Sequence, residues 1–505
     1  MSDARNRVVW VGKEIPNDLR DVAGILGLSV EAIQNLQSFR ANAADLLAVL
    51  VSGAGEDETK ALGRLLRLAR EVHAIDYGVL LGVVSPDAPA AYRLQSELQE
   101  KTGHKIVALG ASRDEFARIL RWPEAAPPAN PQLILPSLRH DYEEEQRDAS
   151  EVDTILLQRA FSDFTEIALK LQPGNFSPES KVWRVEAHSS RVPCQPFVAK
   201  AGRREDLQAE FETYRAFVRD AIPFPFRAPV LEGRFVKGAS RAVLVSAFVS
   251  RSLRLDDYLA TATSPELVMV SLFDGALGAW RRSAERQQIS LGRFYVKQQE
   301  ALASSGASPE EMARKSLLPD PKRLRPAFER ARKHDASLPS PAALWDHLAG
   351  LSETEQPFCL VHGDLNIRNV FVRWNTIDTI LIDFSHSGVQ ESLARDPAKL
   401  ETSIALTAKD SQKNLLSKDI LERLYRPPLL PLWDFTEQDG RTDAIRQIRR
   451  QAGGEGVTND AYGLLIACHL LRFACEPLAA QRDSAKMNER RALTYRLACG
   501  ILKTP

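Results

Sequence analysis

The residues best able to do chemistry lie between positions 358 and 388 of this 505-residue chain. Four polar residues interrupt apolar runs there: His362, Asp364, Asn369 and Asp383. Asn369 follows Asp364 by five residues, and Asp383 follows Asn369 by fourteen. Phosphoryl transfer from a nucleotide needs a carboxylate that accepts the proton of the attacking hydroxyl, and hard oxygen ligands that hold magnesium against the phosphates. Two carboxylates and a carboxamide are the kind of set that this chemistry requires.

Three apolar runs must position these side chains. Residues 358–361, 370–372 and 380–382 read as short strands, and a turn at 374–376 joins the last two. Strands of this length would carry the two carboxylates and the carboxamide at their ends. A plainer alternative stays open, in which the same polar residues only form turns and cap a strand.

The order His-Gly-Asp, then Asn, then Ile-Asp-Phe resembles the catalytic and metal-binding segments of kinase-like phosphotransferases, most of all the aminoglycoside phosphotransferase and choline kinase branch. The resemblance implies that Asp364 is the catalytic base and that His362 braces the loop. Asn369 and Asp383 would bind Mg²⁺, with ATP or GTP as the phosphate donor. Ordinary protein kinases usually have Lys two residues after the catalytic Asp, whereas this chain has Asn366. That difference weakens an ordinary Ser/Thr kinase assignment without excluding a protein acceptor.

A second set of candidate residues lies upstream. Residues 196–200 read as an apolar strand that ends in Lys200, and a helix is predicted over 204–218. In the kinase-like fold a strand Lys pairs with a helix Glu and holds the inner phosphates of the nucleotide. The apolar stripe of the helix places Glu210 on its flank and Glu212 on the opposite face, so we expect Glu210 to be the partner. Alternatively, these charges are only solvated.

The resemblance assigns a phosphate loop to the turn at 173–180, between two strand-like runs. Ser177 and Ser180 would offer hydroxyl and amide groups to the nucleotide phosphates. This turn contains a single Gly, so a plain hairpin turn is an equally good interpretation.

The strand predicted at 241–249 would lead into a hinge between two lobes. Its last residues, Ser246 and Phe248 among them, would supply backbone hydrogen bonds and an apolar slot for a purine.

The C-terminal part of the chain carries helical periods. In the resembling family such helices form the acceptor site, but they contain no dense acidic cluster here, so a cationic aminoglycoside-like or choline-like acceptor is unsupported. The hydroxyl acceptor is therefore unidentified. Asp396 followed by Pro397 predicts a helix N-cap. The helical patterns fall at 255–260, 265–282, 326–334, 458–475 and 488–502.

Residues 1–122 predict a parallel sheet. Continuous apolar runs alternate with amphipathic helical patterns at 58–72 and 88–101, which is typical of strands buried on both faces. With a weaker strand at 28–33, this βα repeat resembles the flavodoxin-like fold of response-regulator receivers. The strand ends lack the acidic pair, the phosphoacceptor Asp and the Lys, so we expect a degenerate receiver that docks a protein partner. The main strands are predicted at 8–11, 46–51, 77–84 and 105–109.

A proline-rich stretch divides the chain. Four prolines fall between Pro123 and Pro131, where neither a helix nor a central strand can continue. The predicted fold class is α/β followed by α+β. A flavodoxin-like domain at 1–122 and a linker at 123–134 precede a bilobal protein-kinase-like domain, with its front lobe at 135–250 and its helical lobe at 251–505.

The composition excludes several function classes. The 66 Lys and Arg residues balance the 66 Asp and Glu residues, so no net field recruits nucleic acid or an anionic membrane. No apolar window reaches the length of a membrane span, and the N-terminus lacks a secretory signal pattern. The five Cys residues form no CxxC pair and read as reduced packing residues. We therefore expect a cytoplasmic protein with no nucleic-acid or membrane partner.

The resemblance implies an Mg²⁺-dependent phosphotransferase that moves the terminal phosphate of ATP or GTP to the hydroxyl of a small molecule or a protein. The N-terminal domain would regulate or target it. The other interpretation is a nucleotide-binding pseudokinase or adaptor in a bacterial signalling or defence assembly. Intact Asp364, Asn369 and Asp383 oppose that interpretation, whereas the scarcity of Gly in the phosphate loop favours it.

Overall fold

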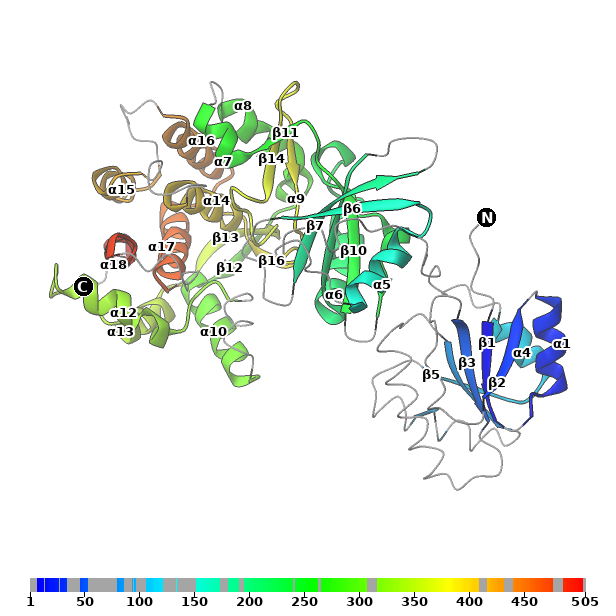
Figure 1. Ribbon diagram of the computed structural model, residues 1–505. Helices are drawn as coiled ribbons and strands as arrows, with labels where there is room; N and C mark the ends of the chain where they lie inside the picture. The colour runs from blue at the N-terminus through cyan, green and yellow to red at the C-terminus, as the bar shows by residue number, and fades with distance from the viewer. Residues whose placement is uncertain are drawn as a thin grey trace. The chain divides into compact units, whose positions relative to one another are not determined.

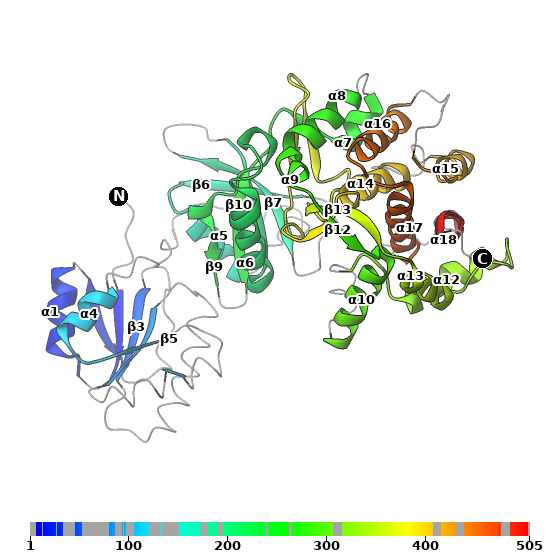
Figure 2. The same ribbon diagram turned by 180° about the vertical axis from the view of Figure 1, so that it is seen from behind.

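The computed structural model of the chain, shown in Figures 1 and 2, divides into two compact units. The first comprises Met1–Phe211 and Pro229–Phe248, and the second comprises Glu212–Ala228 and Val249–Pro505. The structure describes residues 7–12, 14–26, 28–33, 46–52, 80–85, 93, 95, 96, 106–120, 133, 151–172, 180–189, 195–238, 241–261, 265–306, 316–407, 416–430, 439–475 and 485–502.

The first sheet is parallel, which confirms the prediction from the continuous apolar runs. Its five strands follow the order β2-β1-β3-β4-β5, an order found in doubly wound α/β sheets. The flavodoxin-like and receiver-like class of this domain stays a prediction. The strands are β1 (Arg7–Val11), β2 (Ser29–Ile33), β3 (Leu46–Ser52), β4 (Leu80–Val84) and β5 (Ile106–Leu109).

Two helices, α1 (Asn17–Ile25) and α4 (Arg113–Leu120), pack on one face of this sheet (Figure 1). Leu19 of α1 and Phe116 of α4 are both fully buried in the same cluster as Leu50 of β3. The helix predicted at 58–72 and most of that at 88–101 lie outside the described residues.

The second sheet is antiparallel, in the order β6-β7-β8-β10-β9. Strand β8 continues beyond Lys200 because Ala201 and Gly202 still pair with β10. Lys200 therefore lies within the strand, and the prediction that it ends the strand is wrong. The strands are β6 (Glu166–Leu171), β7 (Lys181–His188), β8 (Phe197–Arg203), β9 (Val236–Lys237) and β10 (Arg241–Ala247), with a 3-10 turn η7 at Glu232–Arg234.

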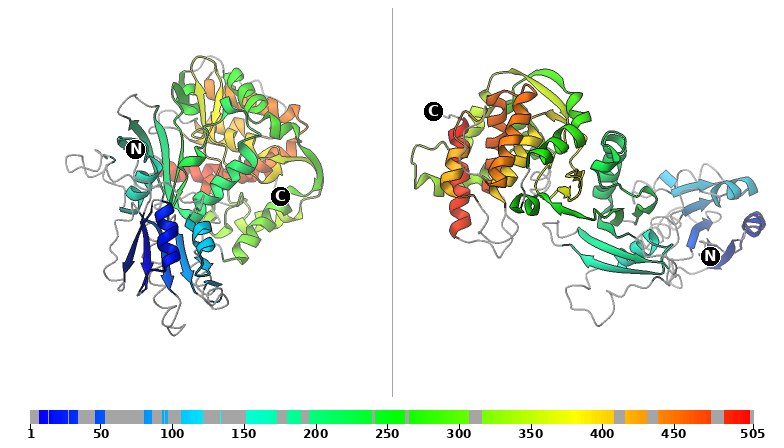
Figure 3. Two further views of the ribbon diagram at one scale, coloured as in Figure 1. Left: turned by 90° about the vertical axis from the view of Figure 1, so that its right-hand side faces the viewer. Right: turned by 90° about the horizontal axis from the view of Figure 1, so that it is seen from above.

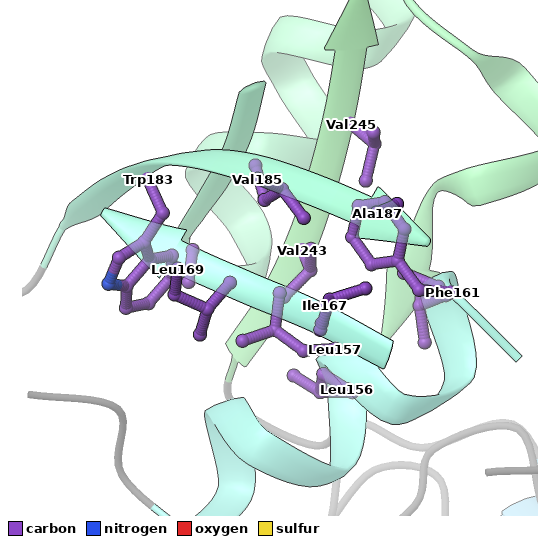
Figure 4. Packing of buried hydrophobic residues seen from close by; sticks show 14 of the residues in the cluster. Leu156, Leu157, Phe161, Ile167, Leu169, Trp183, Val185, Ala187, Val243 and Val245 are labelled. Atoms are coloured by element: carbon purple, nitrogen blue, oxygen red, sulfur yellow. The ribbon is translucent and has the colours of Figure 1, made fainter. Parts of the chain in front are cut away.

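Alternation along β10 gives this sheet two different faces. Val243 and Val245 point into a core that helix α5 (Glu151–Ala160) covers with Leu156 and Leu157 (Figure 4). The intervening Leu244 packs on the other face, against helix α6. Because Lys200 lies opposite Leu244 in the strand register, its side chain is directed to the α6 face.

Helix α6 (Arg204–Thr213) continues as a π-helix, η5 (Tyr214–Val218). The helix predicted over 204–218 is thus present, with its last turn wound more widely. The unit boundary falls beside this change, between Phe211 and Glu212.

Glu212–Ala228 falls inside the predicted front lobe at 135–250 but belongs to the second unit. The Ala228 amide donates to the carbonyl of Leu381 at 3.1 Å, and Arg227 forms a parallel bridge to the same residue. The linker at 123–134 lies outside the described residues apart from Leu133. The other predicted domain boundaries stay predictions.

The second unit is mainly helical and contains two three-stranded sheets, β11-β14-β15 and β12-β13-β16. Helices α17 and α18 lie side by side in it (Figure 3). The helix predicted at 265–282 is divided by a π-helix, and Pro326 lies inside α12, not at its start. The elements are η6 (Phe224–Phe226), β11 (Ser252–Arg254), α7 (Leu255–Thr261), α8 (Pro265–Val270), η8 (Ser271–Ala276), α9 (Gly278–Arg282), β12 (Glu285–Ile289), α10 (Leu291–Ser304), α12 (Pro321–Arg332), α13 (Pro341–Gly350), β13 (Thr354–Leu360), β14 (Val370–Arg373), β15 (Thr379–Leu381), β16 (Gln390–Ser392), α14 (Arg395–Leu406), α15 (Lys418–Leu424), α16 (Gly440–Gly454), α17 (Asn459–Cys475) and α18 (Ala485–Leu502).

Cysteine thiols serve as packing groups in the second unit. Cys359, Cys468 and Cys499 are free and buried, and burial raises the pKa of each thiol to about 12. Such thiols stay protonated and behave as small apolar side chains. Across the described ranges, no helix is both long and apolar enough to cross a membrane.

A buried ion pair joins three helices of the second unit. Glu401 of α14 is fully buried and accepts two hydrogen bonds from the Arg449 guanidinium of α16, at 2.7 and 3.0 Å. The hydroxyl of Tyr462 on α17 donates to the same carboxylate at 2.6 Å. Because both charges lie out of water, each depends on the other for its stability.

We expect Glu401→Gln to lower the free energy of unfolding by about 3–5 kcal/mol, because the buried Arg449 guanidinium loses its counter-charge. Urea denaturation followed by circular dichroism measures the change. Glu266→Gln is the matched control, since its 3.4 Å pair with Arg450 is exposed and should contribute less than about 1 kcal/mol. Equal midpoints for the two variants would contradict the structural role of the buried pair.

Candidate active site

A β-hairpin brings Asn369 and Asp383 together. In the β14–β15 pair Val370 lies opposite Leu381, and one step further the Ile382 amide donates to the carbonyl of Asn369 at 3.1 Å. Asn369 and Asp383 therefore flank the same end of the hairpin. The structure confirms the two strands from which the sequence predicts this arrangement.

Asp364 lies in the loop between β13 and β14, where two amide side chains hold one of its oxygens. The Nδ2 of Asn366 donates to Asp364 Oδ2 at 3.0 Å, and the Nδ2 of Asn369 approaches the same oxygen at 3.3 Å. Both amides also donate to the Asp364 carbonyl. One carboxylate oxygen is thus fixed by neutral donors, which orients the group without protonating it.

The other oxygen of Asp364 faces a cation. Lys399 Nζ of helix α14 lies 3.4 Å from Asp364 Oδ1. Burial alone would raise the pKa of Asp364, but the positive charge of Lys399 is the largest effect that opposes it, and this pKa lies below its usual value. The carboxylate is therefore ionised at neutral pH, the form in which a general base accepts a proton.

His362 has the buried, bonded environment expected of a brace. Its side chain is fully buried, its Nε2 lies 3.0 Å from the carbonyl of Ile382, and its ring packs against Phe384. Its own carbonyl accepts a hydrogen bond from the Ser387 hydroxyl at 3.2 Å. His362 thereby ties the Asp364 loop to the segment that carries Asp383.

The backbone conformation and the close packing at position 363 require a glycine. Its φ is +78°, and a Cβ there would come within 2.5 Å of the carbonyl oxygen of His386. Only glycine meets both conditions without strain. The close approach of the two chain segments therefore depends on this residue.

Asp396 anchors the loop from helix α14. Its carboxylate accepts hydrogen bonds from the His362 amide at 2.7 Å and the Gly363 amide at 3.0 Å. The prediction that Asp396 is a helix N-cap is wrong: Ala394 occupies the cap without a side-chain hydrogen bond. Charge-assisted bonds to two loop amides are available to this carboxylate, and they replace the local capping bond.

Asp383 adopts a left-handed backbone conformation, with φ of 60°. Aspartate tolerates this region better than branched residues, and such conformations gather at functional sites. Its Oδ1 accepts from the Ser385 hydroxyl at 2.9 Å, and that hydroxyl lies 3.1 Å from His386 Nδ1. Burial lowers the pKa of His386, although the charges of Asp364 and Asp383 oppose this effect. We interpret His386 as a neutral member of this network.

In the first unit, Lys200 and Glu210 form the ion pair that the helix pattern predicts. Lys200 Nζ lies 2.7 Å from Glu210 Oε2, and both side chains are mostly buried. Glu212 is exposed. Assignment of this pair to nucleotide phosphates stays a prediction.

Of the two serines assigned to the phosphate loop, Ser177 lies outside the described residues. Ser180 precedes β7, and its Oγ would lie 3.1 Å from a Cβ added to Gly202 of β8. Ser180 therefore lies beside the strand that carries Lys200. Its contact with phosphate stays a prediction.

The backbone groups expected to bind a purine near Ser246 are partly engaged elsewhere. The Ala247 amide donates to the Pro229 carbonyl at 2.9 Å, and the Phe248 amide donates to the Pro196 carbonyl at 3.2 Å. These two N–H groups are already used within the first unit, so they cannot also bind a base. The Arg184 guanidinium covers the Phe248 ring at 4.7 Å.

The hairpin end suits a hard cation such as Mg²⁺. The Asn369 amide nitrogen is engaged with Asp364, which directs its carbonyl oxygen elsewhere. That oxygen and the Asp383 carboxylate are the kind of donors that Mg²⁺ takes, together with phosphates and water. Within the described part of the chain, no group of three or more His, Cys, Asp and Glu side chains is arranged to hold a metal. Two oxygen donors plus substrate phosphates need no such group.

Sequence reasoning missed three residues of this site. Lys399 and Asp396 come from a helix that contains no recognised motif, and their contacts with the loop depend on tertiary packing. Asn366 stood out in the sequence only as a departure from the protein-kinase pattern. Its Asn-x-x-Asn spacing with Asn369 is a local signal that could have indicated a shared partner.

Residues 203–391 match the model of the phosphotransferase enzyme family. The matched stretch contains Glu210, Asp364, Asn369 and Asp383, whereas Lys200 and Lys399 lie outside it. The match confirms the predicted phosphotransferase resemblance for this stretch. The receiver-like resemblance of residues 1–122 stays a prediction. No curated protein matches the chain.

Among solved structures, the chain is similar to an aminoglycoside phosphotransferase, APH(3'')-Id, from Streptomyces rimosus, at 14% identity and a TM-score of 0.29 over 65% of this chain and 92% of the other. An ethanolamine kinase from Plasmodium vivax matches at 10% identity and a TM-score of 0.31, over 65% and 82%. An aminoglycoside-3'-phosphotransferase of type VIII matches at 17% identity and a TM-score of 0.32, over 56% and 93%.

We expect Gly363→Ala to destabilise the protein by about 1–3 kcal/mol, because an Ala Cβ meets the His386 carbonyl and φ is positive. Thermal and urea unfolding measure the loss. Gly500→Ala is the control: it lies in α18 with nothing within 4 Å of the added Cβ, so it should be neutral or stabilise by up to about 1 kcal/mol. Unchanged stability of Gly363→Ala would show that the two segments can separate freely.

Proposed function

We propose that the chain is a phosphotransferase that moves the terminal phosphate of ATP or GTP to a hydroxyl acceptor in an Mg²⁺-dependent reaction. The observation that supports this most directly is the state of Asp364. It is an ionised carboxylate with Oδ2 held by two amides and Oδ1 facing the Lys399 ammonium. It lies beside the hairpin that carries Asn369 and Asp383, in the stretch that matches the phosphotransferase family.

In this proposal Asp364 accepts the proton of the acceptor hydroxyl as its oxygen attacks the terminal phosphorus. The bond from that phosphorus to the bridging oxygen breaks, and the nucleoside diphosphate leaves with the electron pair. The loop keeps its shape through the Asp396 and His362 contacts. Catalysis would then come mainly from positioning the two reactants and from stabilising the charge of the transition state, without a covalent intermediate on the protein.

Asn369 and Asp383 would hold Mg²⁺, which when bound neutralises charge on the nucleotide phosphates. The carboxamide and the carboxylate lie at one hairpin end, and the Asp383 backbone is fixed by the left-handed turn. The chain thus supplies two oxygens, and the remaining ligand positions are open to phosphates and water.

Lys200 would contact the inner phosphates of the nucleotide, with Glu210 keeping its ammonium in place. A paired lysine in the interior loses few degrees of freedom when it meets an anion, which favours binding. The Ser177 and Ser180 turn would contribute further donors. The Ala247 and Phe248 amides are already hydrogen-bonded within the chain. Other groups of residues 246–249 would therefore contact the purine ring of the nucleotide.

The acceptor is a hydroxyl compound of undefined class. Three acidic residues of β16 and α14 are paired within the chain: Asp396 with loop amides, Glu391 with Arg395, and Glu401 with Arg449. These pairings give no support to a strongly cationic acceptor. The N-terminal parallel sheet, a receiver-like domain in this proposal, would regulate or target the reaction through a protein partner.

Asp364→Asn should lower transfer by about 10²–10⁴-fold, because the amide cannot accept the hydroxyl proton. Release or transfer of label from γ-labelled ATP and GTP measures the rate, and a fluorescent nucleotide measures binding, which should survive. Asp346→Asn, a change at an exposed position on α13, is the control. Activity equal to that of the unaltered chain would refute the mechanism. Nucleotide binding with no Asp364-dependent turnover in any variant would favour the pseudokinase interpretation.

Asp383→Asn should weaken the Mg²⁺-dependent part of nucleotide binding, because a carboxylate ligand becomes a neutral amide. The dissociation constant is measured with Mg²⁺ and again with EDTA, and the difference between the two should shrink. Asp378→Asn lies on the turn of the same hairpin, 3.9 Å from Arg373, and should leave that difference unchanged. If both variants behave alike, Asp383 is not the magnesium ligand.

A further inference from the structure

Lys399 is an unusual residue of helix α14. All the other residues of this helix, from Arg395 to Leu406, are buried, and Lys399 alone is partly open to solvent. Its side chain retains 18% exposure. A lysine in so buried a helix needs a counter-charge or an outlet to water. Its position therefore has to be explained by what lies at its tip.

At that tip is the carboxylate oxygen of Asp364 that the loop amides leave free. Lys399 Nζ lies 3.4 Å from Oδ1, whereas Asn366 and Asn369 approach Oδ2. The contact is longer than the usual distance of about 2.7–2.9 Å for a charge-assisted bond. Lys399 Nζ and Asp364 Oδ1 therefore border the same point, and a third polar group beside the pair could contact both atoms.

The surroundings leave the Lys399 charge directed to this point. Asp396 and Glu401, the acidic residues of the same helix, are engaged with loop amides and with Arg449. His469 of α17 is buried, and burial together with Lys399 and Arg395 holds its pKa well below its usual value. His469 is therefore neutral and does not compete as a cation.

We propose that Lys399 is a further catalytic residue, whose ammonium group contacts the phosphoryl group during its transfer beside Asp364. This inference rests on the proposed function. Asn366 occupies the loop position where ordinary protein kinases carry a lysine, so a cation supplied by α14 would replace the charge missing at that position.

The proposed step conserves charge and protons. The acceptor proton moves to Asp364 Oδ1 as the new oxygen–phosphorus bond forms, and the bond to the nucleoside diphosphate breaks with its electron pair. Lys399 stays protonated throughout and donates hydrogen bonds to a phosphoryl oxygen. Because charge spreads over those oxygens in the transition state, a cation at this point stabilises it more than the ground state.

The competing explanation is that Lys399 only balances the charge of Asp364. A purely structural pair predicts that neutralising Lys399 changes stability and nucleotide affinity together. A catalytic contact predicts a lower kcat with nucleotide affinity retained, and partial recovery by arginine, which keeps the charge.

The test uses the full chain with γ-labelled ATP, Mg²⁺ and water as the acceptor probe. Lys399→Met, Lys399→Arg, Asp364→Asn and Lys418→Met are compared for kcat, for the dissociation constant of a fluorescent ATP analogue and for Tm. Lys418 is the matched control, because it forms a 3.8 Å pair with Glu422 on an exposed surface of α15. We expect Lys399→Met to lower kcat by about 10²–10³-fold, with the dissociation constant within about threefold of that of the unaltered chain.

Lys399→Arg should recover at least about tenfold of the activity that Lys399→Met loses. The proposal is overturned if Lys399→Met retains the kcat of Lys418→Met, or if both Lys399 variants lose activity together with Tm and nucleotide binding. If Asp364→Asn is as active as the unaltered chain, the proposed function itself fails. If Asp364→Asn is inactive and Lys399→Met is fully active, only the role of Lys399 fails.

Discussion

Two hydrogen bonds from loop amides to the Asp396 carboxylate hold the candidate site in shape. The His362 and Gly363 amides point at this one group, so the chain must turn where Gly363 allows a positive φ. Each bond to a charged group contributes about 1.5–3 kcal/mol net. Asp364, the next residue along the chain, takes its direction from them. The orientation of the proposed base is thus determined by a helix that begins more than thirty residues later.

Several contacts within the second unit position the side chains around this loop. The β14–β15 register places Asn369 beside Asp383, and the buried His362 ties the loop to the same hairpin. Helix α14 presents Lys399 at the remaining oxygen of Asp364. Because α14 is itself fixed by the buried Glu401–Arg449 pair, an ion pair in the interior also serves the accuracy of the site.

Local patterns in the sequence predict the hairpin strands, the parallel sheet and the choice of Glu210 as the partner of Lys200. The strands follow from short apolar runs, and the position of Glu210 follows from the apolar stripe of its helix, interpreted through the kinase-like resemblance. None of these needs knowledge of distant contacts. The roles of Asp396 and Lys399 cannot be predicted in this way. Their neighbours are far away in the chain, and a local N-cap is the better interpretation of Asp396-Pro397 until tertiary bonds to the loop amides compete with it. The sequence predicts a strand end at Lys200 because the small residues Ala201 and Gly202 give no strand signal.

Helix α14 carries both the loop anchor and the lysine, since Lys399 follows Asp396 by three residues. Residues so spaced share one side of a helix, and each added residue rotates that side by about 100°. A single insertion between Lys399 and Glu401 would thus swing both groups away from the loop at once, because the buried Glu401–Arg449 pair fixes the rest of the helix. Every residue of the His-Gly-Asp and Ile-Asp-Phe segments would remain intact. Homologous chains that keep those segments but carry an insertion at this point of the helix would show the recognisable motifs of the site without the two residues that complete it.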